Sequence, residues 1–180
     1  MGAFLFGFLV LRTLLIAQGA QEQRSLTPLH YFVGEWVGTG DGEPGVSTVS
    51  RTYRFVLDER FLQVENTSAY APQEINKKGE VHSDIGFFSF DKSRKRIAFR
   101  QFHSEGFVNQ YSMDSLSADG KTFTLLTESI ENIPAGWRAK EVYRILNENE
   151  FEEVFSLAPP GKYFEVYSTT RLKRNQPGEH

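Results

Sequence analysis

Short runs of strand-forming residues recur between residues 32 and 173, and no segment there keeps a 3.6-residue apolar period. Each run ends at Gly, Pro, Asn or Asp, which are turn residues. Thr27-Pro28 is typical of a helix N-cap followed by proline, so it predicts one short helical turn through Tyr31. The runs predict ten strands, at residues 32–39, 47–57, 60–70, 80–90, 95–104, 107–116, 122–130, 137–147, 150–158 and 162–173.

Most connections between these runs are as short as hairpin turns, for example Asp58-Glu59 and Glu105-Gly106. Ten antiparallel strands joined in this way form an up-and-down meander, and closure removes its exposed edges. We therefore predict an all-β fold, a single closed barrel of about ten strands over residues 27–174. A barrel of this width leaves a cavity that side chains do not fill. The two longer connections, 71–79 and 131–136, either rim the open end or are plain surface loops.

The composition favours strands around an aromatic interior. The 180 residues include 16 Phe and 7 Tyr but only 2 Met. A net charge of -3 with no basic concentration lacks the electrostatic footprint of a nucleic-acid-binding protein. The absence of cysteine excludes disulfides, thiolate metal sites and cysteine nucleophiles.

The N-terminal segment, residues 1–20, is apolar and ends in small residues. Ala17-Gln18-Gly19 fits the cleavage pattern of a secretory signal, so we expect a secreted or periplasmic protein without stable membrane insertion after cleavage. The alternative is an uncleaved anchor, but Arg12 divides the apolar run into pieces too short to span a bilayer comfortably. The polar tail, residues 175–180, is expected to be disordered.

The first predicted strand carries Gly34-x-Trp36, and the last carries the basic residues Arg171 and Lys173. This combination resembles the signature of the calycin barrels, which include the fatty-acid-binding proteins. The resemblance implies a barrel floor closed by the indole, with a basic side chain packed over its ring. We expect Arg171 to be that side chain. The helix pair of fatty-acid-binding proteins is absent, because only residues 39–46 separate the first two runs.

A closer resemblance is to the nitrobindin-like, haem-binding barrels. It is carried by Gly34-Glu-Trp-Val-Gly-Thr-Gly40, by His82-Ser-Asp-Ile-Gly-Phe-Phe88, in which Asp84 stands where glutamate is usual, and by the segment 97–106. The family implies a proximal haem ligand, a histidine on the last strand, and peroxynitrite isomerase chemistry. The corresponding segment, 163–172, contains no histidine. Tyr163 or Tyr167 offers a phenolate as a weaker alternative, although such tyrosines more commonly pack across strands.

Residues two apart on a strand share a face, which gathers several polar side chains on the predicted inner wall. One interpretation is that they orient a ligand's polar end. Another is that His82 and Asp84 form a hydrogen-bonded pair that fixes the barrel. A metal site with two histidines and one carboxylate would require His82, Asp84 and His103 to converge. The predicted ligand-binding residues are His82, Asp84, Phe88, Phe99, Gln101, His103, Asn109, Tyr111, Arg51 and Tyr53, above a floor of Gly34, Trp36 and Arg171.

No catalytic apparatus is recognisable in the chain. There is no nucleophile elbow and no His-Glu-x-x-His motif, and Glu152 and Glu153 point to opposite faces. We therefore predict a protein that binds a small apolar or planar ligand, without haem or metal as cofactor and without nucleic acid as partner. The alternatives are a haem-binding protein or peroxynitrite isomerase, and a structural or interaction barrel with a filled core.

Overall fold

The computed structural model describes residues 26–175, which form a short 3-10 helix followed by ten strands. The elements are η1 (Thr27–Phe32), β1 (Gly34–Gly42), β2 (Ser47–Val56), β3 (Phe61–Tyr70), β4 (Glu80–Asp91), β5 (Arg96–His103), β6 (Val108–Leu116), β7 (Thr122–Glu131), β8 (Arg138–Asn147), β9 (Glu150–Ala158) and β10 (Glu165–Arg174).

The ten strands and the helical turn lie where the sequence predicts them, with small differences at the ends. β1 continues to Gly42, beyond the predicted end at 39, because its pairing with β10 extends to Ser168. Thr27 belongs to η1 and does not cap it, since the cap position is Leu26 and no side chain makes a capping hydrogen bond. The role predicted for Thr27 is therefore wrong.

The predicted signal segment, 1–20, and nearly all of the predicted tail lie outside the described residues. Export therefore stays a prediction, which the N-terminal sequence of the purified mature chain would test. Between residues 26 and 175, no helix has the length and hydrophobicity needed to cross a membrane.

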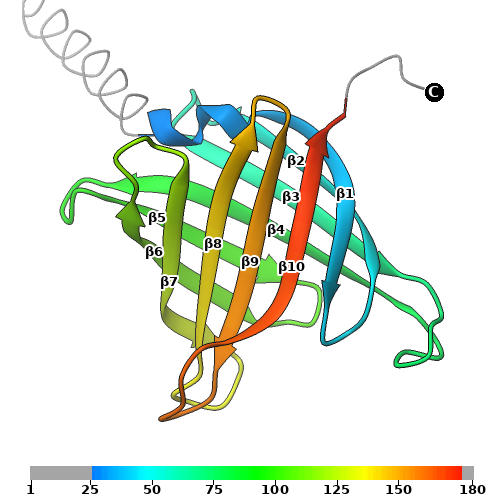
Figure 1. Ribbon diagram of the computed structural model, residues 1–180. Helices are drawn as coiled ribbons and strands as arrows, with labels where there is room; N and C mark the ends of the chain where they lie inside the picture. The colour runs from blue at the N-terminus through cyan, green and yellow to red at the C-terminus, as the bar shows by residue number, and fades with distance from the viewer. Residues whose placement is uncertain (1–25, 176–180) are drawn as a thin grey trace, which may run out of the picture.

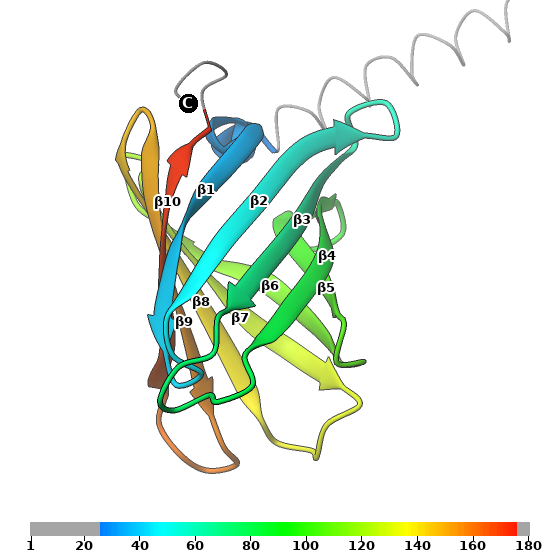
Figure 2. The same ribbon diagram turned by 90° about the vertical axis from the view of Figure 1, so that its right-hand side faces the viewer.

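The strands form one closed antiparallel barrel in the order of an up-and-down meander, as predicted (Figure 1). Each strand pairs with its neighbour in sequence, and β1 pairs with β10 to close the sheet. The helix η1 lies at one end of the barrel, which is the end that contains the start of β1 and the end of β10 (Figures 1 and 2). The long connections 71–79 and 131–136 lie at the opposite end (Figure 2).

The end of the barrel near η1 is filled by aromatic side chains. Trp36, Phe32 and Phe151 are at most 1% exposed, and their rings meet edge to face at centroid distances of 4.8 to 4.9 Å. The indole Nε1 of Trp36 donates a hydrogen bond of 2.6 Å to the carbonyl of Phe32. Leu26 and Leu29 of the helical segment are fully buried against this cluster. The helix is therefore a plug that removes apolar surface from water at the floor of the barrel.

A guanidinium packs over the Trp36 ring as the calycin resemblance implies, but it belongs to Arg174. Its Cζ lies 4.2 Å from the ring centroid, and the side chain donates hydrogen bonds of 2.8 Å to the carbonyls of Val33 and Tyr31. The assignment of Arg171 is wrong, because Arg171 is exposed and pairs with Glu150. The reason is register: Trp36 lies directly opposite Arg174.

Gly34 is fitted to this arrangement at the start of β1. Its φ is +123°, a conformation that residues with a side chain rarely adopt. A Cβ at this position would also stand 3.0 Å from a guanidinium nitrogen of Arg174. The predicted floor residues Gly34 and Trp36 are thus in place, with Arg174 as their basic partner.

We expect Arg174→Ala to lower the free energy of unfolding by about 1–3 kcal/mol, because it removes a cation–ring contact and two charged hydrogen bonds. The matched variant Arg171→Ala loses only an exposed ion pair and should leave the free energy of unfolding nearly unchanged. Urea unfolding followed by tryptophan fluorescence measures both. Equal losses for the two variants would contradict this account of the floor.

Candidate ligand-binding site

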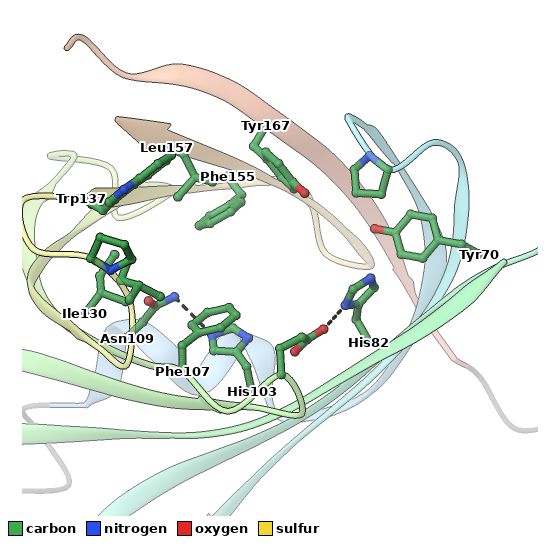
Figure 3. Close-up of a pocket in the computed structure, with 14 residues that line it drawn as sticks. Tyr70, His82, His103, Phe107, Asn109, Ile130, Trp137, Phe155, Leu157 and Tyr167 are labelled. Atoms are coloured by element: carbon green, nitrogen blue, oxygen red, sulfur yellow. Dashed lines mark hydrogen bonds and ion pairs between the residues drawn. The ribbon is translucent and has the colours of Figure 1, made fainter. Parts of the chain in front are cut away.

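A cavity of about 580 Å³ occupies the open end of the barrel. The structure therefore fills the floor of the barrel with the aromatic plug and leaves the opposite end open. The cavity wall combines strand residues with residues of the β1–β2, β5–β6 and β7–β8 connections, and the side chains surround a common opening (Figure 3). The lining residues are Pro44, Tyr70, His82, His103, Glu105, Phe107, Asn109, Ile130, Ile133, Pro134, Trp137, Phe155, Leu157 and Tyr167.

Tyr167 reaches the cavity through a β-bulge in β10. The pairing of β10 with β9 shifts between Val166 and Ser168, so Tyr167 is an extra residue without a partner across the ladder. A bulge of this kind redirects a side chain, and here the phenol ring faces inward toward the cavity (Figure 3). Tyr163, the other tyrosine predicted as an alternative ligand, is 93% exposed and is not on the cavity wall.

His103 and Asn109 form a polar contact on the wall. The side-chain nitrogen of Asn109 lies 3.2 Å from Nε2 of His103 (Figure 3). It also donates a hydrogen bond of 3.0 Å to the hydroxyl of Tyr111. The His103 ring stacks on Phe107 with centroids 4.0 Å apart. Burial lowers the pKa of His103, an effect that the nearby Asp84 carboxylate opposes and His82 reinforces. His103 is therefore a neutral imidazole at pH 7.

His82 and Asp84 do not bond each other, so the alternative of a His82–Asp84 pair is wrong. His82 pairs through Nδ1 with Glu105 of the β5–β6 turn, and its Nε2 lies 3.3 Å from a carboxylate oxygen of Glu80. Asp84 instead accepts hydrogen bonds of 2.9 Å from the amides of Asn66 and Gln101. In residues 26–175 no group of three or more acidic or histidine side chains is arranged to hold a metal ion, so the three-residue metal site is not formed either.

Below the cavity a layer of buried polar side chains crosses the barrel. Arg51 of β2 forms an ion pair with Glu153 of β9, which is separated from β2 in the sheet by β1 and β10, and its Nε donates a hydrogen bond of 2.9 Å to Asn66. Asn66 in turn donates to Asp84, so the layer continues across β3 and β4. The inward orientation predicted for Arg51 and Tyr53 on β2 is confirmed, because both are buried while Arg54 is exposed.

Glu141 of β8 is a third buried acid in this layer, besides Glu153 and Asp84, and it has no cation of its own. It is 2% exposed and accepts a hydrogen bond of 3.0 Å from the Tyr143 hydroxyl. Burial, with the neighbouring charge of Glu153, raises the pKa of Glu141 to about 8. Arg51 pairs with Glu153, and Glu141 keeps its proton at pH 7.

The structure divides the predicted site residues between three levels. His82, His103 and Asn109 lie on the cavity wall. Phe88 and Phe99 stack on each other in the core with centroids 4.0 Å apart. The remaining predicted residues are buried or half-buried below the cavity and do not line it: Asp84, Gln101, Tyr111, Arg51 and Tyr53.

Sequence reasoning missed Glu141 and Glu153 as members of the inner layer. The signal was present, because residues two apart from them on β8 and β9 are Ala139, Tyr143 and Phe151, all buried. It also missed the aromatic wall residues Tyr70, Phe107, Trp137 and Phe155. Of the two interpretations of the 131–136 connection, the rim is confirmed, since Ile133 and Pro134 line the cavity.

The raised pKa of Glu141 predicts a pH-dependent stability. The ordinary pKa is 4.5 and the folded value is about 8, so between these values the folded protein holds a proton that the unfolded chain releases. Stability due to this group therefore falls as the pH rises from 4.5 to 8 and then levels off. Glu141→Gln should remove this dependence and stabilise the protein by about 1–3 kcal/mol at pH above 8, with little gain near pH 5.

Denaturant unfolding across this pH range measures the effect. Glu152→Gln is the matched control, because Glu152 lies on the outer face of the next strand and pairs with the exposed Arg144. Parallel pH profiles for the wild type and Glu141→Gln would contradict a buried protonated acid.

Comparison with known proteins agrees with this barrel. The solved structure of Rv2717c from M. tuberculosis is similar with a TM-score of 0.66 and 19% identity, over 84% of this chain and 98% of that chain. The S-type phycobiliprotein lyase CPES from Guillardia theta is similar with a TM-score of 0.50 and 13% identity, over 81% of this chain and 89% of that chain. At these identities the likeness shows the fold alone. No curated protein sequence matches the chain.

A family model extends the agreement from fold to sequence. It describes a THAP4-like, heme-binding beta-barrel domain and matches residues 25–174, which include every strand of the barrel. The match thus covers both the plugged floor and the cavity. On this basis the chain belongs to the family of THAP4-like, heme-binding beta-barrel domains.

Proposed function

We propose that the protein binds one small, flat and mainly apolar molecule in the cavity at the open end of the barrel. The cavity carries this proposal: a volume of about 580 Å³ lies within the range of small-molecule sites, and its wall is apolar with a few polar groups. Ring faces from Phe155, Trp137 and the stacked pair His103–Phe107 suit a planar molecule (Figure 3).

The lower half of the barrel supports this role because it holds the cavity open. The Arg51–Glu153 ion pair joins β2 to β9, which are not neighbours in the sheet, and removal of either partner would leave a buried charge uncompensated. The layer lies below the cavity and does not line it, so its role is to hold the strands in place around the open end. A barrel with a completely filled core, one of the alternatives, does not match the open upper half.

The cavity residues do not fit haem. Tyr167 occupies the last strand, and burial, together with the nearby Tyr70, Glu43 and Glu80, raises its pKa, which opposes the phenolate that iron requires. The two imidazoles of the cavity, His82 and His103, already face Glu105 and Asn109. The lining residues all lie within 26–175, and none of them is a lysine or arginine that could pair with a haem propionate. We propose a ligand other than haem.

Filling the cavity tests the function. Ile130→Trp places a larger side chain on the cavity wall and should abolish binding of Nile red, a neutral planar dye whose emission shifts to the blue in apolar surroundings. The wild type should bind one dye per chain. Ile85→Trp is the matched control, because Ile85 points outward from β4 and is 46% exposed, and it should bind as the wild type does.

Circular dichroism and thermal unfolding would show that both variants keep the barrel. Equal dye binding by Ile130→Trp and the wild type would place the ligand elsewhere and overturn the proposed function. Native mass spectrometry of the protein as purified would then show whether any small molecule accompanies it.

The haem alternative has its own test. We expect titration of the wild type with hemin to give no stoichiometric Soret shift. Tyr167→His places an imidazole at the bulge of β10, where it points into the cavity without a ladder partner, and should produce a Soret-shifted complex. Tyr163→His, at an exposed position, is the control and should resemble the wild type. A wild-type complex of unit stoichiometry would favour the haem-binding alternative.

A further inference from the structure

The charged groups at the cavity are of one sign. Among the fourteen lining residues, all of them within 26–175, Glu105 is the one carboxylate, and there is no lysine or arginine. Glu80 lies beside the wall, 3.3 Å from Nε2 of His82. His82 therefore faces two carboxylates, and even a protonated imidazole would leave the group with a net negative charge.

Five aromatic rings share this wall: Tyr70, Phe107, Trp137, Phe155 and Tyr167. The face of an aromatic ring carries negative electrostatic potential, so it attracts an organic cation that has lost its water. Tyr70 and Tyr167 lie on the side of the cavity where His82 is found, and Tyr70 meets the His82 ring edge to face at 5.4 Å (Figure 3). The aromatic wall and the carboxylates are therefore close together.

Asn109 supplies an independent observation. It lines the cavity, it is 1% exposed, and its side-chain nitrogen donates to Tyr111 and lies near His103. Its Oδ1 is buried and has no hydrogen-bond partner. A buried carbonyl oxygen without a partner is costly, and what this one lacks is a donor such as an N–H group.

We infer that the ligand of this cavity is an amine, bound as its cation with an aromatic or apolar body. This inference rests on the proposed function and adds the charge of the ligand. The ammonium group would lie near Glu105 and the faces of Tyr70 and Tyr167, and the body would lie against Phe155 and Trp137. An anion such as a fatty acid would bring an unpaired charge into a site that offers it no cation.

Three probes of one shape and different charge test the inference. Naphthylmethylamine, naphthylmethanol and naphthoate share the same ring system and are cationic, neutral and anionic at pH 7. Isothermal titration calorimetry with the full chain should rank their affinities in that order. The expected gap between the amine and the carboxylate is at least about tenfold.

Glu105→Gln should lower the affinity for the amine by about fivefold or more and leave the affinity for the alcohol nearly unchanged. Glu65→Gln is the matched control, because Glu65 lies on the outer face of β3 and pairs with Arg54. It should bind all three probes as the wild type does. Both substitutions are at partly exposed side chains, so the barrel should fold in each case.

The outcomes separate this inference from the proposed function. Equal affinities for the three probes, or a preference for naphthoate, would overturn the inference that the ligand is an amine. The proposed small-molecule site would then still stand. An equal loss of amine and alcohol binding in Glu105→Gln would likewise overturn the charge argument. Failure of all three probes to bind, together with failure of Nile red, would overturn both.

Discussion

Closure of the sheet between β1 and β10 is the constraint on which the rest of the molecule depends. The two strands come from opposite ends of the domain, and Trp36 lies opposite Arg174 where they meet. The guanidinium covers the indole and also holds the carbonyls of the η1 segment, so one side chain joins the seam to the plug. Because closure leaves no free edge, the strands keep a single register, and that register decides which side chains face inward.

The interior that follows from this register changes character along the barrel axis. Aromatic residues fill the floor, ionic and amide groups cross the middle, and an apolar wall surrounds the open end. The middle layer contributes little apolar burial, and its acids and arginine cost desolvation that their hydrogen bonds offset. Its value to the molecule is positional, since the bond between β2 and β9 fixes two strands that are not neighbours in the sheet.

The fold could be predicted because alternation and turn residues are local signals. Ten runs bounded by turns leave few arrangements, and the closed meander is the one without exposed edges. The inner face of β2, β4 and β5 followed from the same alternation, so His82, His103 and Arg51 were found. Depth along the barrel axis was not predictable in this way. Alternation distinguishes inside from outside, but it does not separate Phe99 in the core from His103 on the cavity wall.

Two further errors have long-range causes. The choice between Arg171 and Arg174 depended on the offset between the first and last strands, which no local pattern encodes. Glu141 and Glu153 were overlooked because acidic residues on strands usually face water. Their burial depends on an arginine that lies more than eighty residues earlier in the chain.

The bulge in β10 gives position 167 a freedom that its neighbours lack. The residue there takes no part in the ladder between β9 and β10, and its carbonyl accepts a hydrogen bond from the amide of Glu43, a main-chain bond that does not depend on the side chain. A substitution at this position would change the chemistry of the cavity wall without changing the pairing of β9 and β10. The chemistry of the cavity and the pairing that holds the barrel can therefore be altered independently at this position.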